Sequence, residues 1–270
     1  MSVAADRWPS RVVVLAASCR TGSTLLAAAL ARTGAMGRRA HELFHEEALR
    51  RLSNLEMLQA RPSLRQILEA RSPGQAMPRS AYSTEEIVKM LDRIGRRETG
   101  AQGVLSLKVM WGDYAGVLLA RGLDFNYWGA PITWLRIRRL DHERQAVSWS
   151  RAAQTGQWTS AGSARSIPTF RPEQIAHYLA MARKWDEGWD NHFQALGIQP
   201  FTIHYEDLSD AYEATIRALY DHLGLADHAV PPAPLRRQSD TLNENWLRQF
   251  KAWQASWPHA SVVSSDGTRP

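Results

Sequence analysis

Short runs of β-branched and other apolar residues alternate along this chain with longer segments of helical periodicity. The short runs predict strands at residues 11–16, 104–108, 132–137 and 199–204. The longer segments predict helices at residues 23–33, 46–58, 84–95, 142–155, 172–196 and 212–223, with Thr84 as the N-cap of the third. This alternation predicts an α/β fold in which a mostly parallel sheet is flanked by helices.

The same pattern bounds the domain. Residues 61–84 indicate an insertion before the second strand, and residues 230–234 form a proline-rich break before a separate C-terminal segment. Glu206 and Asp207 follow the fourth strand and are expected to form a turn or cap a helix. We expect a single domain over residues 1–255 and a flexible tail over residues 256–270.

Composition narrows the class of protein. At 270 residues and 44% hydrophobic content, the chain can bury one substantial α/β core. Cys19 is its single cysteine, which excludes an intrachain disulfide and a cysteine-based zinc site. No segment is apolar enough to cross a bilayer, and the first nine residues lack the apolar core of a secretory signal, so a cytoplasmic protein is expected. The net charge of +6 suits an anionic ligand, whereas the scattered arginines predict no nucleic-acid partner.

The first strand leads into a candidate phosphate-binding loop. Residues 18–22 read Ser-Cys-Arg-Thr-Gly, and an Ala/Leu-rich helix follows at once, so backbone N–H groups at its N-terminus can bind an anion. In the ATPase pattern G-x-x-x-x-G-K-[ST], Ala17 would replace the first glycine and Ser23 the lysine. The cation lies inside the loop instead, at Arg20. The loop therefore fits a phosphate group better than Mg-ATP.

A carboxylate flanked by two histidines follows the loop helix. Glu42 lies between His41 and His45, and the chain often returns toward a phosphate site after leaving it. Glu42 could act there as a general base, while a His41/His45 metal pair lacks an evident third ligand. The plainer alternative is a solvated helix start.

Two further clusters lie at strand ends, where ligands bind in open parallel sheets. Lys108 and Trp111 close the second strand, and a lysine in a buried strand needs an anionic partner. Arg139 follows the third strand, with Ser148 further along the next helix, and this pair suits a second anionic group. Strand alternation places Arg136 on the face opposite its neighbour in sequence; a solvated charge run is the alternative for the arginines.

A fourth cluster lies at the end of the helix predicted over residues 142–155. Gly156 is expected to end it in the left-handed conformation, which leaves Gln154 and Trp158 to line a pocket.

These motifs together resemble the bacterial trehalose-sulfating sulfotransferase family. The resemblance is carried by residues 20–24, 42–44, 108–111, 139–148 and 154–158, in this order and at similar intervals, and extends from Val12 to about Trp246. It implies a P-loop-like, three-layer sulfotransferase fold and a homodimer. The implied reaction moves a sulfuryl group from 3′-phosphoadenosine 5′-phosphosulfate to a hydroxyl of a carbohydrate, such as a trehalose-like sugar or glycolipid, or of a hydroxylated small-molecule metabolite.

The resemblance also implies roles for individual residues. Glu42 is the general base, while Arg20 and Lys108 offset charge on the leaving phosphate, so that no metal is required. The residues expected to bind the donor are Arg20, Thr21, Gly22, Ser23, Thr24, Arg139, Arg144 and Ser148. Those expected to bind the acceptor are His41, Phe44, His45, Trp111, Gln154 and Trp158.

Two departures from the family pattern bear on these roles. Arg144 replaces a small hydroxyl residue, and the histidines around Glu42 admit an acceptor other than trehalose. Two other functions compete with the sulfotransferase. One is a kinase-like phosphotransferase, disfavoured because Ser23 stands in the lysine position and no strand ends in a clear magnesium-binding aspartate. The other is a nucleotide-binding module without catalysis.

Overall fold

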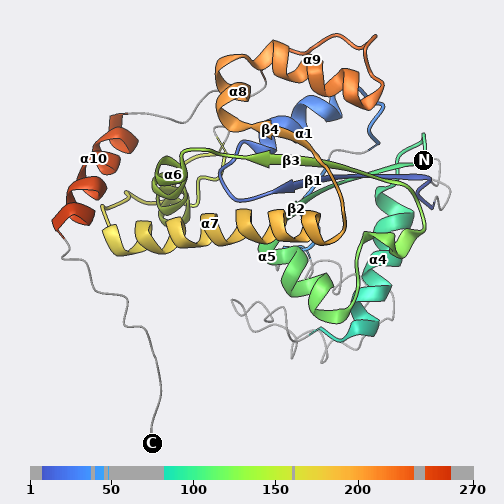
Figure 1. Ribbon diagram of the computed structural model, residues 1–270, viewed down its shortest axis with the longest axis horizontal. Helices are drawn as coiled ribbons and strands as arrows, with labels where there is room; N and C mark the ends of the chain where they lie inside the picture. The colour runs from blue at the N-terminus through green and yellow to red at the C-terminus, as the bar shows by residue number, and fades with distance from the viewer. Residues whose placement is uncertain are drawn as a thin grey trace, which may run out of the picture.

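The computed structural model describes residues 8–37, 40–45, 48, 82–159, 162–233 and 241–256. Within these residues one four-stranded sheet has the order β2-β1-β3-β4, and every neighbouring pair is parallel (Figure 1). The strands are β1 (Arg11–Ala17), β2 (Val104–Met110), β3 (Ile132–Arg138) and β4 (Phe201–His204). Each overlaps a predicted strand, and the predicted α/β class is confirmed.

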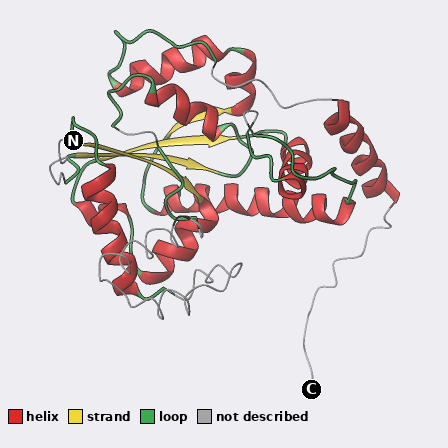
Figure 2. Cartoon of the chain, turned by 180° about the vertical axis from the view of Figure 1, so that it is seen from behind, coloured by secondary structure: helices red, strands yellow, loops and turns green. Residues whose placement is uncertain are grey.

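Helices cover both faces of the sheet (Figures 1 and 2). On one face lie α1 (Ser23–Ala31), α8 (Tyr205–Asp210) and α9 (Tyr212–Leu223). On the other lie α4 (Thr84–Glu98), α5 (Trp111–Asp113) and α7 (Pro172–Ala195). The short helices η2 (Tyr114–Leu118), η3 (Leu119–Arg121) and η4 (Phe125–Trp128) join β2 to β3. The result is three layers, as expected.

Two further helices extend the domain beyond the carboxyl ends of the strands, where α6 (His142–Thr155) and α10 (Thr241–Ser256) pack with α7 (Figure 1). No helix in the described parts of the chain is long and apolar enough to cross a membrane.

The central strand β1 is apolar throughout because both of its faces are buried. Val12 and Val14 pack in the cluster formed with α4 and α7, whereas Val13 and Leu15 pack in the cluster formed with α1 and α9. Burial on two faces explains why the sequence shows a continuous apolar run rather than an alternating one. Packing on both faces also fixes the end of β1, from which the loop of residues 18–22 begins.

The structure corrects two local predictions. The N-cap of α4 is Ser83 rather than Thr84, because the Ser83 hydroxyl accepts from the Glu86 N–H at 3.2 Å while the Glu86 carboxylate accepts from the Ser83 N–H at 2.7 Å. Glu206 and Asp207, expected in a turn or as helix caps, lie in the first turn of the short helix α8, whose N-cap is His204.

Three predicted segments fall largely or wholly outside the described residues: the helix at 46–58, the insertion at 61–84 and the tail at 256–270.

Candidate active site

The predicted site residues converge on one edge of the sheet because the strands are parallel and their carboxyl ends meet there. The loop of residues 18–22 leaves β1 at this edge, Lys108 lies near the end of β2, and Arg139 directly follows β3. Register supports this convergence, since Leu15 pairs with Lys108 and Ala17 with Ile137.

The loop after β1 is closed by its own side chains and backbone. The Thr21 hydroxyl donates to the Ser18 carbonyl at 2.8 Å. Gly22 has a φ of 82°, and a Cβ there would approach the Tyr205 ring to 2.9 Å, so both conformation and space require glycine. Arg20, with a φ of 65°, is the only non-glycine residue of the described chain in the left-handed region. This conformation costs about 1–2 kcal/mol, so contacts from outside the loop must hold it.

Those contacts come from the elements after β3. Arg20 donates from Nε to the Ser148 hydroxyl at 3.0 Å and from a terminal nitrogen to the Trp158 carbonyl. Arg139 donates to the Arg20 carbonyl at 3.3 Å and stacks its guanidinium 4.4 Å from the centre of the Tyr205 ring. Arg20, Arg139 and Ser148 therefore lie together, as the two predicted anion sites require.

Arg20 and Arg139 also bring two positive charges into a largely buried position. Burial, and to a smaller extent the charge of Arg139, lower the pKa of Arg20 to about 10. An anion bound beside Arg20 would raise the pKa of its guanidinium again, because an opposite charge favours the charged form.

A second chain of contacts links the loop helix to the candidate base. The Lys108 ammonium donates to the Thr24 hydroxyl at 3.0 Å and forms an ion pair with Glu42 at 2.7 Å. The Lys108 N–H donates to the His41 carbonyl at 3.2 Å, in a parallel bridge that places residues 41 and 42 beside β2. The segment after α1 thus does return to the loop.

Two other residues expected to bind the donor nucleotide lie in different surroundings. Ser23 is buried in the first turn of α1, directly after Gly22. Arg144 forms ion pairs with Asp141 and Glu244, which tie α6 to α10, and among the described residues its contacts are with these carboxylates. Arg144 lies one helical turn before Ser148 on the same face of α6, and its part in the 3′-phosphate site stays a prediction.

Three residues expected to bind the acceptor are held by contacts with other parts of the protein. Phe44 is 1% exposed and lies in the core beside Phe125, with ring centres 5.8 Å apart, because it faces the sheet while Glu42 faces the loop. Trp111 packs edge-on against Trp189 at 5.2 Å. The side chain of Gln154 donates to Gln174 at 2.8 Å and accepts from the Thr169 N–H, so it holds the following loop.

The other expected acceptor residues lie at the rim of the site. His41 and His45 are exposed beside Glu42, and Trp158 is 48% exposed while its carbonyl accepts from Arg20. Gly156 ends α6 with a φ of 68°, as predicted.

Two carboxylates that the sequence did not place in the site also stabilise it. Glu206 accepts from the N–H groups of Leu140 and Asp141 at 3.2 and 3.3 Å, so α8 fixes the segment after Arg139. Asp186 lies on α7 and accepts from the Ser18 hydroxyl at 2.8 Å. A signal existed for Asp186, because it occupies the buried stripe of α7 where every other member is apolar: Ile175, Leu179, Ala182, Trp189 and Phe193.

No group of three or more histidine, cysteine, aspartate and glutamate side chains within the described residues is arranged to hold a metal ion. Cys19 is a free thiol in the loop, and burial raises its pKa well above the ordinary range.

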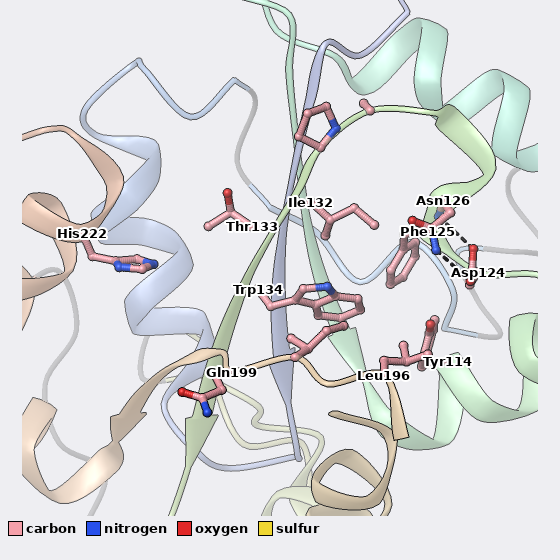
Figure 3. Close-up of a pocket in the computed structure, with 13 residues that line it drawn as sticks. Tyr114, Asp124, Phe125, Asn126, Ile132, Thr133, Trp134, Leu196, Gln199 and His222 are labelled. Atoms are coloured by element: carbon pink, nitrogen blue, oxygen red, sulfur yellow. Dashed lines mark hydrogen bonds between the residues drawn. The ribbon is translucent and has the colours of Figure 1, made fainter. Parts of the chain in front are cut away.

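A cavity of about 460 Å³ lies at the opposite edge of the sheet, near the amino end of β3 (Figure 3). Trp134 lies between Asp124 on one side and His222 on the other. The described residues that line this cavity include neither lysine nor arginine, so it lacks the cations that an anionic donor requires.

Comparison with known proteins agrees with the chemistry of the carboxyl edge. The model of the Stf0 sulphotransferase family matches residues 12–253. The trehalose 2-sulfotransferase of Mycolicibacterium smegmatis is 26% identical over 269 residues, which cover 90% of this chain and 95% of the relative. The enzyme of the same name from Mycobacterium tuberculosis is 26% identical over 267 residues, with the same coverage.

Two solved structures were also found. Sulfotransferase STF9 from Mycobacterium avium aligns with a TM-score of 0.46 and 15% identity, covering 91% of this chain and 68% of that one. The sulfotransferase domain of the Synechococcus PCC 7002 olefin synthase aligns with a TM-score of 0.41 and 15% identity, covering 93% and 97%. The family match, which spans most of the sequence, decides against the kinase-like and non-catalytic alternatives: the chain belongs to the Stf0 sulphotransferase family and is an enzyme.

Proposed function

We propose that this sulfotransferase uses 3′-phosphoadenosine 5′-phosphosulfate as donor and a hydroxyl of a carbohydrate or hydroxylated metabolite as acceptor, with Glu42 as general base. The observation that carries the proposal is the chain of contacts from Thr24 through Lys108 to Glu42, at 3.0 and 2.7 Å. It connects the first turn of the phosphate-loop helix directly to a carboxylate. A donor held at that helix would have its sulfur close to a group that can accept a proton.

The donor assignment is supported by two groups of anion-binding residues. The first is the loop, where the N-terminal N–H groups of α1 and the side chain of Arg20 suit the 5′-phosphosulfate. The second is Arg139 with Ser148, which suits the 3′-phosphate. Arg20 contacts Ser148 at 3.0 Å, so the two groups adjoin, as the two ends of one nucleotide would need.

In the proposed reaction, the acceptor oxygen attacks sulfur while the bond from sulfur to the 5′-phosphate oxygen breaks. Glu42 takes the proton of the hydroxyl as the new O–S bond forms. Negative charge accumulates on the departing adenosine 3′,5′-bisphosphate, where Arg20 and Lys108 stabilise it. Lys108 can serve both partners because its ammonium lies between Thr24 and Glu42.

The acceptor side is supported by position and by the relatives. His41, His45 and the ring of Trp158 are exposed around Glu42 and Arg20, where they could contact a polyol. Since two relatives are named trehalose 2-sulfotransferases, trehalose is the first acceptor to test.

The test is a screen that measures release of adenosine 3′,5′-bisphosphate from the donor in the presence of trehalose, other sugars, glycolipids and phenols. The proposal expects acceptor-dependent release by the wild-type protein, which continues when divalent metal is chelated. Glu85→Gln is a matched control, because Glu85 forms an ion pair with Lys89 at the same 2.7 Å but on the exposed surface of α4. Loss of release in Glu42→Gln but not in Glu85→Gln supports the base assignment. Full release in both variants contradicts it.

Two further properties complete the proposal: a homodimer, which the family resemblance implies, and a cytoplasmic location, which the sequence composition led us to expect. Light scattering of the purified protein tests the first, and a monomer at all concentrations would contradict it. Cell fractionation tests the second.

A further inference from the structure

A buried carboxylate on α7 joins three elements of the site. Asp186 has a side chain only 3% exposed. One of its oxygens accepts from the Ser18 hydroxyl and from Arg136, both at 2.8 Å. The other accepts from Nε2 of His142 at 3.0 Å. These four residues, hereafter the Asp186 cluster, belong to the phosphate loop, β3, α6 and α7.

The Asp186 cluster contains residues from the elements that form both proposed anion sites. Ser18 begins the loop that contains Arg20 and Gly22, whereas His142 begins α6, the helix that carries Ser148. Other contacts between the loop and α6 exist, such as the bond from the Gln145 amide to the Cys19 carbonyl at 2.7 Å. Arg20 and Ser148 would have to reorient their bond if each bound a phosphate. The bond from Ser18 to Asp186 would stay, because Ser18 is fully buried and its hydroxyl already donates to Asp186.

The charge of Asp186 is well supported. Burial alone would raise the pKa of this carboxyl, but hydrogen bonds from His142 and Ser18 and the charge of Arg136 hold it below the ordinary value. An ionised carboxylate accepts hydrogen bonds on both of its oxygens, whereas an amide accepts on one oxygen only.

We infer that Asp186 is a positioning residue that fixes the distance between the 5′-phosphosulfate site and the 3′-phosphate site, and thereby sets the preference for a nucleotide with phosphates at both positions. This inference rests on the proposed function, because it assumes that both anion sites bind one donor. A rigid ligand with two anionic ends gains affinity only if the two protein sites are held at the matching distance. Asp186 contacts neither phosphate in this account and acts through Ser18 and His142.

The test measures three ligands by calorimetry. Adenosine 3′,5′-bisphosphate uses both sites, 5′-AMP uses the loop, and 3′-AMP uses Arg139 and Ser148. The variants Ser18→Ala and His142→Ala each remove one bond to Asp186 while Arg136 keeps its buried counter-ion. For each, we expect the affinity for the bisphosphate to fall about tenfold, within the range typical of coupling between sites, while each monophosphate changes less than about twofold.

Matched variants separate positioning from general damage. His142→Gln keeps an N–H donor for Asp186 and should restore most of the lost affinity. Glu85→Gln removes an ion pair with Lys89 at 2.7 Å on the exposed surface of α4 and should leave all three affinities unchanged. Asp186→Asn should reproduce the loss; if removal of the counter-ion prevents folding, the Ser18 and His142 variants decide the question.

Two results would overturn the inference. One is a similar loss of affinity for all three nucleotides in Ser18→Ala and His142→Ala, which would indicate local disruption. The other is unchanged bisphosphate binding in both. Failure of the proposed function gives a different pattern, because wild-type protein would then bind the bisphosphate no more tightly than either monophosphate.

Discussion

The two edges of the sheet differ in a way that explains where the chemistry lies. The amino edge has a hollow of about 460 Å³, lined by aromatic, aliphatic and polar residues around Trp134. The carboxyl edge instead gathers buried and partly buried charges: Arg20, Arg139, Lys108 and Glu42. A hollow can follow from loops that fail to meet, whereas several charges are held near one another only by specific hydrogen bonds and ion pairs.

This comparison indicates that gathered buried charges mark the active site better than the volume of a hollow does. Removing charged groups from water is costly unless partners compensate for them. At the carboxyl edge the partners are other site residues, such as Glu42 for Lys108 and Ser148 for Arg20. The largest effects on catalysis should therefore come from substitutions at the carboxyl edge, and the smallest from substitutions in the cavity.

The largest effect is expected at Glu42. Glu42→Gln keeps the size of the side chain but cannot accept a proton, so turnover should fall about 10²–10⁴-fold while donor affinity stays near that of wild type. Steady-state kinetics with a saturating acceptor, together with calorimetry of the donor product, measure both quantities. If Glu42→Gln stays active while His41→Ala or His45→Ala abolishes turnover, a histidine is the base instead.

A comparable free-energy change, but in folding, is expected at Phe44. This ring is buried beside Phe125, so Phe44→Ala should lower the free energy of unfolding by about 3–5 kcal/mol. Denaturant unfolding measures it. Phe44→Leu should recover most of this stability, with a KM for the acceptor near that of wild type. A stable Phe44→Leu variant with a greatly raised acceptor KM would restore the acceptor role that the sequence first predicted.

Next comes Arg20. Arg20→Ala removes the guanidinium that we propose contacts the phosphosulfate in both ground and transition states, so donor binding and turnover should weaken together, by about 1.5–3 kcal/mol in binding. Ser23→Ala removes one hydroxyl among several donors and should be milder. Unchanged donor affinity and kcat/KM in Arg20→Ala would make the loop structural only.

The smallest effect is expected at the amino edge. Gln199→Ala and His222→Ala alter the lining of the cavity without touching the charges of the other edge, so kcat/KM should stay within about twofold of wild type. A large loss in either variant, with normal thermal stability, would reverse the contrast between the edges.

The sequence was most informative where local patterns decide structure. Continuous apolar runs identified the strands because β1 is buried on both faces, and the run into Ser18–Gly22 identified the loop because a strand, a tight polar turn and a helix follow one another without a gap. Lys108 was expected to need an anionic partner, and it has one in Glu42.

The sequence was least informative where the partner is distant along the chain. Asp186 meets Ser18 across 168 positions, and nothing in the local sequence of α7 says which cation or hydroxyl its carboxylate will face. Gln154 and Phe44 neighbour site residues in the sequence, yet one bonds to Gln174 and the other packs in the core, because adjacent side chains point in different directions. The catalytic and binding roles of the site residues remain predictions.

The central claim is that the carboxyl edge holds two adjoining anion sites for one nucleotide. Isothermal titration calorimetry of the wild-type protein with adenosine 3′,5′-bisphosphate and with AMP tests it most directly. Since loss of a charged hydrogen-bonded contact costs about 1.5–3 kcal/mol, the bisphosphate should bind about 10- to 150-fold more tightly than AMP. Equal affinity for the two nucleotides would contradict the account.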